Sequence, residues 1–423
     1  MSRPVIETLA TGDEVVSGDV VDSNSAFIAS LLTRHGLPLT RHGALPDDGE
    51  LLAQGILEIS ERADLCICSG GLGPTEDDLT ADIVGKVIGA PVDIDEEAIR
   101  RMKARFLEMN YRFTENNLRS ARVPRGARAF QNDAGTAPAF AVKIGRCEFF
   151  FLPGVPREFR FFAKNHVLPW AEARWPNGVA ATVQLKTLGW VESHLAEKFE
   201  DFAHEFPTVK VGYRAHTPEI WIKFTAEAAT RALALESLGP ALAEARIRIG
   251  GTVFGQDDDE LPTMVHRELL ASRKTLSTAE SCTGGWVAHL LTSLPGSSAY
   301  FRGGVIAYSN ELKQALLGVT DATLREHGAV SRETAKALCE GALAKLGSDL
   351  AISITGIAGP DGGTPDKPVG LVFLGLAWKD AGGIQCQVLE RRFRGDRERV
   401  QKAATFTALE MIRRRLAGVL ALD

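Results

Sequence analysis

A short apolar run that ends in a Gly-rich or acidic loop, and often continues into residues with helical spacing, recurs along this chain. It occurs at residues 5–10, 64–68, 274–277 and 350–354. Such runs are typical of strands that are buried on both faces, and their alternation with helices indicates a parallel sheet with crossover connections. We therefore expect an α/β protein with a doubly wound N-terminal domain, a small α+β middle domain and an α/β C-terminal domain.

The length and composition of the chain support several domains of an ordinary soluble protein. At 423 residues the chain is too long for one ordinary core, and its 45% apolar and 24% charged residues are typical of globular proteins. The formal net charge of -6 argues against a general nucleic-acid binder. We expect domains at residues 1–172, 173–256 and 257–423, with the order β-α-β-β-α in the middle one.

The same totals bear on location and on cysteine chemistry. No apolar run approaches the length of a membrane span, and the first expected strand begins too early for a signal peptide, so we expect a cytoplasmic protein. The six cysteines contain no C-x-x-C pair and are expected to be reduced core residues, with Cys282 as the exception to watch. The scattered histidines make a zinc site an unfavoured hypothesis.

The loop at residues 278–285 carries the densest chemistry. It holds hydroxyls, a thiol and two glycines just before the helical pattern at residues 286–294. At such a turn the first N–H groups of the helix favour a phosphate or a developing oxyanion. Ser281 and Cys282 are the available nucleophiles, and the alternative is that Ser281 or Thr283 only caps the helix.

A serine nucleophile needs a group that accepts its proton, and no histidine lies nearby in the sequence. Residues 301–313 combine a β-like run with Tyr308 and Lys313, which makes a Ser-Lys or Ser-Tyr-Lys arrangement the natural candidate. Free Lys and Tyr titrate near about 10, so the site would have to lower the pKa of one of them. The loop at residues 355–363 follows another strand and is expected to face the same crevice.

The run at residues 278–285, Tyr308 with Lys313, the loop at residues 356–363 and the sequence around Arg397 together resemble the C-terminal domain of the CinA (competence/damage-inducible) family. The resemblance implies a nicotinamide mononucleotide (NMN) amidohydrolase in pyridine nucleotide recycling. Ser281 would attack the amide, Lys313 with Tyr308 would manage the protons, and no metal would be required. The substrate-binding residues would be Glu280, Thr283, Gly284, Gly285, Asn310, Thr355, Gly356, Ala358, Gly359 and Arg397.

Two of these expectations have reasons of their own. Backbone N–H groups around Thr283 and Gly284 are expected to hold the oxyanion. Arg397 is expected to hold the nucleotide phosphate, because a guanidinium can bind a phosphate with two hydrogen bonds. The alternative for the basic cluster around Arg397 is a solvated start of a helix.

A second candidate site follows the strand at residues 64–68. Its loop, residues 69–80, has three glycines that let the backbone approach a phosphate, whereas the acidic run at residues 76–78 has the wrong charge to touch one. A divalent cation such as Mg²⁺ or Mn²⁺ between the acids and a diphosphate would resolve this conflict. The alternative is a surface loop whose acids cap the next helix.

This loop, with residues 11–14 and 152–158, resembles the molybdopterin-binding (MoaB/MogA-like) domain in the N-terminal half of CinA proteins. The resemblance implies a metal-dependent (Mg, Mn or Co) ADP-ribose pyrophosphatase, with Asp48 and Asp78 nearest the metal. Ala139 and Val155 depart from the usual Gly and Pro of the family, which would strain or loosen the backbone there. The other expected site residues are Asp13, Glu14, Asn24, Ser69, Gly70, Gly71, Gly73, Thr75, Pro153, Gly154 and Glu158.

The middle residues resemble the KH-like domain of full-length family members. Residues 189–192 do not supply the basic Gly-x-x-Gly loop that clamps nucleic acid, so we expect a spacer or dimerisation module. The resemblance implies a homodimer with NMN and ADP-ribose as ligands and no membrane partner. Two alternatives stay open: ADP-ribose hydrolysis as the main activity, or a non-catalytic nucleotide-binding partner in DNA uptake or repair.

Overall fold

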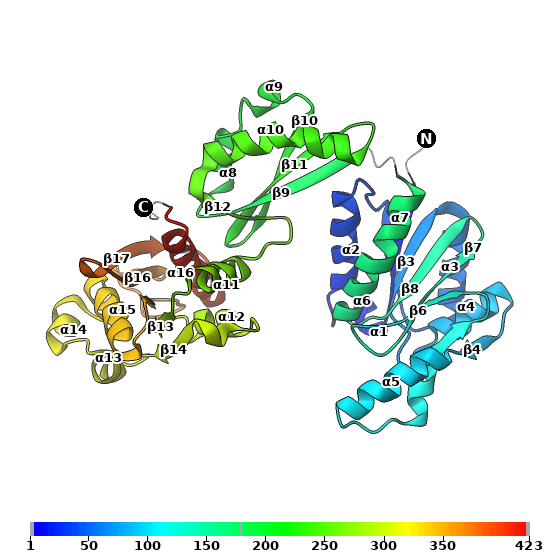
Figure 1. Ribbon diagram of the computed structural model, residues 1–423, viewed down its shortest axis with the longest axis horizontal. Coiled ribbons are helices and arrows are strands. Elements are labelled where there is room, and N and C mark those ends of the chain that lie inside the picture. Colours follow the sequence, from blue (N-terminus) through cyan, green and yellow to red (C-terminus); the bar gives the residue numbers. More distant parts are fainter. Residues whose placement is uncertain (1–3, 177–179, 420–423) are drawn as a thin grey trace. The chain divides into compact units, whose positions relative to one another are not determined.

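The computed structural model describes residues 4–176 and 180–419 (Figure 1). The chain divides into two compact units. The first contains the residues up to Thr182 together with Thr225–Ser237, and the second contains Val183–Phe224 together with the residues from Leu238 onward. The N-terminal and C-terminal parts of the chain each contain a sheet with adjacent parallel strands and with helices on its faces. The predicted α/β class is confirmed, and the middle and C-terminal parts have separate sheets.

The N-terminal sheet has the strand order β2-β1-β3-β8-β7-β6. The first four strands in this order are parallel, and β7 and β6 continue the sheet in antiparallel fashion. The strands are β1 (Ile6–Thr11), β2 (Arg41–Leu45), β3 (Leu65–Ser69), β6 (Arg128–Phe130), β7 (Ala139–Ile144) and β8 (Cys147–Leu152).

Helices cover both faces of this sheet, as a doubly wound fold requires (Figure 1). Because successive side chains of a strand point to opposite faces, Phe150 joins the core under α2, α6 and α7, whereas Phe149 and Phe151 join the core under α3 and α4. The helices are α2 (Ser23–Arg34), α3 (Gly49–Arg62), α4 (Thr80–Ile88), α6 (Pro156–Phe162) and α7 (Leu168–Arg174).

Shorter elements complete this part of the chain, and the middle part forms its own sheet. The short ones are α1 (Asp13–Val16), β4 (Val92–Ile94), α5 (Glu96–Glu108), η1 (Glu115–Ala121), β5 (Arg122–Pro124) and η2 (Ala163–Val167).

The middle sheet has the order β10-β11-β9-β12. Its elements are β9 (Ala180–Leu188), α8 (Glu192–Glu197), α9 (Phe202–Glu205), β10 (Val209–His216), β11 (Glu219–Glu227), α10 (Arg231–Ile249), η3 (Gly250–Thr252) and β12 (Val253–Gln256).

The C-terminal sheet has the order β14-β13-β15-β16-β17, with β14, β13 and β15 parallel and β16 and β17 antiparallel. Helices α11, α12 and α16 pack on one face and α15 on the other. The strands are β13 (Leu276–Glu280), β14 (Phe301–Ile306), β15 (Leu350–Gly356), β16 (Leu371–Asp380) and β17 (Gly383–Arg392). The helices are α11 (Leu261–Ser272), α12 (Trp286–Thr292), η4 (Ser297–Ala299), α13 (Asn310–Leu317), α14 (Asp321–His327), α15 (Arg332–Leu346) and α16 (Arg397–Leu416).

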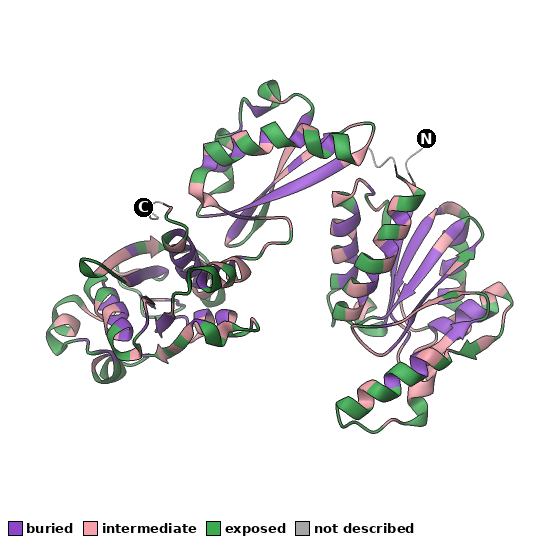
Figure 2. Ribbon diagram, viewed as in Figure 1, coloured by how far each residue is buried: buried purple, intermediate pink, exposed green. Residues whose placement is uncertain are grey.

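Burial follows this layering (Figure 2). The central strands β1, β3, β8, β13 and β15 are buried along almost their whole length, while the outer faces of the helices are exposed. Within the described residues, no helix has both the length and the apolar character needed to span a bilayer.

We expect Gly341→Ala to destabilise the protein, because a Cβ at Gly341 on α15 would overlap the carbonyl oxygen of Leu317 at the end of α13. A backbone atom cannot move aside cheaply, so the cost should be about 1–3 kcal/mol. Thermal denaturation of the full chain would show a lowered Tm. The matched control is Gly239→Ala on α10, where a Cβ meets nothing within 4 Å. Equal Tm values for the two variants would contradict the packing argument.

Candidate active sites

Three loops leave the C-terminal sheet at the same edge. The amide of Ser281 donates to the carbonyl of Ile354 at 3.0 Å, and the amide of Ala307 donates to the carbonyl of Glu280 at 2.9 Å. These bonds continue the parallel register of β14, β13 and β15 by one residue. The loops that begin at Ser281 and Ala307 therefore start side by side, and β15 continues to Gly356 before its own loop leaves the same edge, where α/β sheets place their sites.

A buried carboxylate holds the first of these loops. Glu280 is 1% exposed, and its carboxylate accepts hydrogen bonds from the hydroxyl of Thr283 at 2.8 Å and from the amides of Gly285, Val287 and Ala288 at 3.2, 3.1 and 2.9 Å. It therefore satisfies the first free N–H groups of α12. We expected Glu280 to bind substrate, but in the structure its carboxylate binds the hydroxyl and amides of the turn.

Ser281 and Cys282 follow directly and are both largely buried, with 8% and 5% exposure. Burial raises the pKa of the Cys282 thiol to about 12, so this thiol stays protonated near neutral pH and lacks the reactivity of a thiolate. The amide of Gly284 donates to the carbonyl of Ser281 at 3.1 Å, so this N–H group is already used within the turn. Of the two amides expected to hold an oxyanion, that of Thr283 is the remaining candidate.

Lys313 lies on the first turn of α13 with 2% exposure. Its Nζ donates to the carbonyls of Ala307 and Tyr308, at 2.9 Å in each case. Burial lowers the pKa of Lys313, although the neighbouring Cys282 and Glu311 act in the opposite direction. The amine is thus packed against the loop that starts beside Ser281, with its pKa shifted in the direction that a proton acceptor needs.

The structure connects Arg397 to two of the three loops. One terminal nitrogen of Arg397 donates to the hydroxyl of Tyr308 at 2.8 Å, and the other donates to the carbonyl of Gly359 at 2.8 Å. The Tyr308 side chain is exposed. Both terminal nitrogens of Arg397, which we expected to hold a phosphate, therefore contact the protein itself in this structure.

Sequence reasoning did not include Gln401, whose side chain donates to the carbonyl of Cys282 at 2.6 Å. The available signal was spacing, because Gln401 lies four positions after Arg397 and residues four apart share one face of a helix. Helix α16 thus contacts all three loops.

The other predicted C-terminal residues are divided between the loops and the sheet. Asn310 begins α13 and is exposed. Thr355 is 1% exposed, and its hydroxyl donates to the carbonyl of Ala329 at 2.6 Å. Gly356 ends β15, where a Cβ would meet β16, and Ala358 is buried. Thr355 and Gly356 thus fix the end of β15, from which the loop with Gly359 starts.

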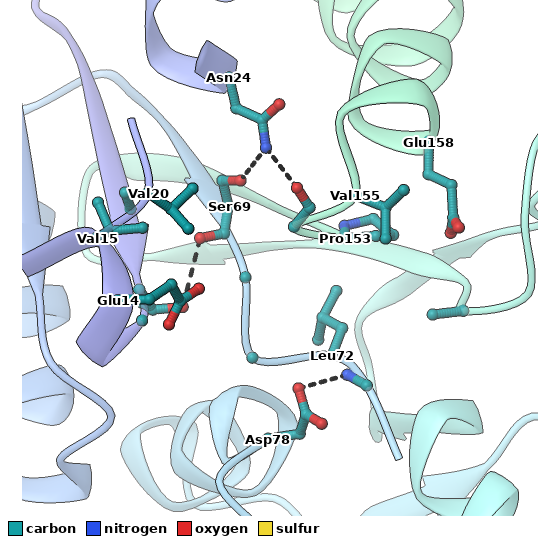
Figure 3. A pocket seen from close by; sticks show the side chains of 18 of the residues that line it. Glu14, Val15, Val20, Asn24, Ser69, Leu72, Asp78, Pro153, Val155 and Glu158 are labelled. Atoms are coloured by element: carbon teal, nitrogen blue, oxygen red, sulfur yellow. Dashed lines mark hydrogen bonds between the residues drawn. The ribbon is translucent and has the colours of Figure 1, made fainter. Parts of the chain in front are cut away.

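The N-terminal unit has a cavity of about 450 Å³ at the carboxyl ends of β1, β3 and β8 (Figure 3). It is lined by the loops that follow these strands and by the start of α6. Of the predicted residues, Asp13, Asp48 and Thr75 are not part of the lining. Those that line it are Glu14, Asn24, Ser69, Gly70, Gly71, Gly73, Asp78, Pro153, Gly154 and Glu158.

The two predicted metal ligands have structural roles in this fold. The carboxylate of Asp78 accepts hydrogen bonds from the amides of Gly73 and Thr75, at 2.6 and 2.8 Å, and from the Thr75 hydroxyl, so it closes the loop after β3 (Figure 3). Asp48 caps α3 by accepting from the amides of Glu50 and Leu51, both at 2.9 Å.

Asp47, rather than Asp48, faces the cavity, together with Glu14 and Asp77. Burial raises the pKa of Asp47, and the neighbouring carboxylates of Asp13, Glu14 and Asp77 raise it further. Such crowding of negative charge is relieved by a hard cation. In the part of the chain that the structure describes, however, no three His, Cys, Asp or Glu side chains are grouped closely enough to chelate an ion. The metal site stays a prediction, and it requires a bound diphosphate to supply some of the oxygen ligands of the cation.

Hydrogen bonds from Asn24 and Asn132 hold Ser69, Gly154 and Glu158, which line this cavity. The side-chain nitrogen of Asn24 donates to the Ser69 hydroxyl and to the Gly154 carbonyl, at 2.8 Å each, and so joins the loops after β3 and β8 (Figure 3). Asn132 donates to the carboxylate of Glu158 at 2.5 Å, and burial raises the pKa of Glu158. A Cβ at Gly135 would overlap the Glu158 carboxyl group, so this glycine makes the room that Glu158 occupies.

The two departures from the family pattern cause no strain in the structure. Ala139 is the first residue of β7 and pairs with β6, so its backbone is extended and needs no positive φ. Val155 precedes α6 with φ -61°, a value open to most residues. The expectation that Ala139 strains the backbone is therefore wrong, because the residue lies in a strand rather than in a turn.

The chain is similar to known proteins along almost its whole length. Three family models match successive parts of the chain: "Probable molybdopterin binding domain" at residues 7–173, "Damage-inducible protein CinA KH domain" at residues 182–255, and "CinA C-terminal domain" at residues 258–416. The crystal structure of the competence/damage inducible protein CihA from Agrobacterium tumefaciens is 41% identical and covers 36% of this chain and 90% of that chain, with a TM-score of 0.34.

Relatives match from end to end. A CinA-like protein of Anaeromyxobacter sp. (strain Fw109-5) is 42% identical over 419 residues, which cover 96% of this chain and 98% of the relative. The CinA-like protein of Citrifermentans bemidjiense is 41% identical over 411 residues, 97% of each chain. That of Desulfosudis oleivorans is 37% identical over 414 residues, 97% of this chain and 100% of the relative. With full-length relatives and all three family models in order, the chain belongs to the CinA family.

Proposed function

We propose that the C-terminal domain hydrolyses the carboxamide of NMN to nicotinate mononucleotide and ammonia. The observation that carries the proposal is the common edge of the sheet from which the Ser281 turn and the loop over Lys313 both start. A serine and a buried amine with a lowered pKa, on loops that start from neighbouring strands, are the groups that a Ser-Lys hydrolase uses. The residues involved need no metal for this chemistry.

In this mechanism the Ser281 hydroxyl attacks the amide carbon and its proton passes to the neutral amine of Lys313. The Thr283 amide stabilises the oxyanion of the tetrahedral intermediate. Lys313 then returns the proton to the amide nitrogen, the C–N bond breaks and ammonia leaves, with the acyl group on Ser281. Water hydrolyses this ester by the same proton route, which releases nicotinate mononucleotide and restores the Ser281 hydroxyl.

In this mechanism Arg397 and Tyr308 position the two loops and contact the substrate. They do not transfer a proton in the first step. Arg397 holds the exposed Tyr308 hydroxyl and the Gly359 carbonyl in one place, so the two loops form a common wall for a nucleotide. The guanidinium keeps its positive charge in this arrangement and favours an anionic substrate nearby.

We expect Ser281→Ala and Lys313→Met each to lower ammonia release from NMN by about 10³-fold or more, because each removes a group that acts in the reaction. Cys282→Ala should keep most of the activity, since the thiol is protonated and buried. Lys336→Met, which removes an exposed lysine on α15, is the matched control. The measurement is ammonia release by the intact protein with and without EDTA. Retained activity in Ser281→Ala, or its loss in Cys282→Ala, would contradict the assignment.

The pH dependence follows from the neutral form of Lys313 being the active one. Burial lowers its pKa from the ordinary value of 10.5, so the neutral fraction and kcat/KM should rise with pH and level off below that value. Lys313→Arg should abolish this rise together with the activity, because a guanidinium stays charged. A kcat/KM that is constant from about pH 6 to 10 would show that Lys313 is not the proton acceptor.

We propose a second activity, hydrolysis of the diphosphate of ADP-ribose, for the N-terminal cavity. The observation that favours it is a cavity whose floor is glycine backbone and whose edge carries the acidic side chains of Glu14, Asp47 and Asp77. A divalent cation, when bound, would neutralise the diphosphate and activate water. The chain's own residues supply the amides and glycines that admit the phosphates and the carboxylates that attract the cation.

The structure distinguishes two neighbouring aspartates for this activity. Asp47→Asn should lower metal-dependent release of AMP from ADP-ribose at least about tenfold, because it removes a carboxylate from the cavity. Asp48→Asn is the matched control, since Asn also caps helices well and Asp48 does not line the cavity. If Asp48→Asn has the larger effect, the site uses the aspartate implied by the family resemblance. If neither chemistry occurs and nucleotides still bind, the chain is a binding protein.

A further inference from the structure

Two thiols outside both candidate sites lie against each other in the C-terminal unit. The Sγ atoms of Cys339 on α15 and Cys386 on β17 are 3.4 Å apart, although the residues are 47 positions apart in the sequence. A disulfide bond has a length of about 2.05 Å, so a small shift of the two side chains would join them. Cys386 lies on the edge strand of the sheet and Cys339 on the helix that covers it.

The two sulfurs differ in accessibility and in acidity. Cys339 is fully buried, whereas Cys386 is partly exposed. The contact between the two sulfurs lowers the pKa of Cys386 and raises that of Cys339, and the Cys339 thiol also donates to the carbonyl of Lys336 at 3.1 Å. Lys336 also lowers the pKa of Cys386, while burial and Glu340 raise it. The accessible sulfur is therefore the one that ionises more readily, and the buried one is placed to react second.

The other four cysteines lack this combination. Cys66 and Cys68 have their sulfurs 3.8 Å apart, yet both are buried and lie two positions apart on the central strand β3. Burial raises the pKa of Cys66 and of Cys147, as it does for Cys282. All six cysteines lie within the described residues, and of these the pair at 339 and 386 alone offers an accessible sulfur beside a second one.

We propose that Cys386 and Cys339 form a site of reversible oxidation by hydroperoxides. The Cys386 thiolate attacks one oxygen of hydrogen peroxide, the O–O bond breaks, and the departing hydroxide takes up a proton to form water. Cys386 is then a sulfenic acid. The Cys339 sulfur attacks the Cys386 sulfur, and its proton leaves with the hydroxyl group as a second water. The two thiols have lost two hydrogens, and a thiol reductant reverses the change.

The test treats the full chain with hydrogen peroxide and digests it without reduction. Mass spectrometry should detect the peptides of Cys339 and Cys386 joined, with the loss of two hydrogens, and dithiothreitol should separate them. Tm should rise on oxidation, because the bond closes a long loop in the unfolded chain. Cys386→Ser should show neither the joined peptides nor the Tm shift, whereas the control Cys68→Ser should show both.

A second variant identifies the order of events. In Cys339→Ala, Cys386 should stop at the sulfenic acid, which dimedone traps in greater amount than in the original protein. Sulfinic acid at Cys386 without joined peptides in the original protein would overturn the proposal. So would a loss of two hydrogens within the single peptide that holds Cys66 and Cys68 instead, or a Tm shift that persists in Cys386→Ser.

Discussion

The geometry of the C-terminal site depends on the buried carboxylate of Glu280. It collects the Thr283 hydroxyl and three backbone amides at the end of β13, so the chain must leave the sheet in one tight turn directly after this residue. Ser281 is the next residue, and its amide is fixed by the neighbouring strand β15. A charged group that would be costly to bury alone is thus stabilised by the N-terminal end of α12, and this places the serine.

The two candidate sites achieve their shape by different means. The N-terminal cavity is open because glycines keep part of its lining free of side chains, and hydrogen bonds such as the two from Asn24 join the segments around it. The C-terminal site is organised from outside the sheet by α16, where Arg397 and Gln401 hold loops that come from three different strands. The first arrangement suits a ligand that approaches backbone, and the second suits side-chain chemistry that needs fixed positions.

Strand ends were predictable from the sequence because buried strands leave continuous apolar runs, and parallel strands bring their following loops to one edge. This reasoning predicted that the loops carrying Ser281 and Lys313 leave neighbouring strands at one edge, as β13 and β14 do. Side-chain direction was not predictable in this way: neighbouring Asp47 and Asp48 differ only in which of them caps α3. Arg397 was expected to meet a phosphate, yet its contacts with Tyr308 and Gly359 depend on two loops that are distant in the sequence.

The space that Gly135 leaves for Glu158 also restricts how this cavity can change during evolution. While Glu158 keeps this position, a side chain at position 135 would collide with its carboxyl group, so the end of the Glu158 side chain would have to move and lose the hydrogen bond from Asn132. Shortening residue 158 first meets no such collision, because it only adds space beside Gly135. Substitutions at the two positions are therefore expected to have a direction, with residue 158 changing before residue 135.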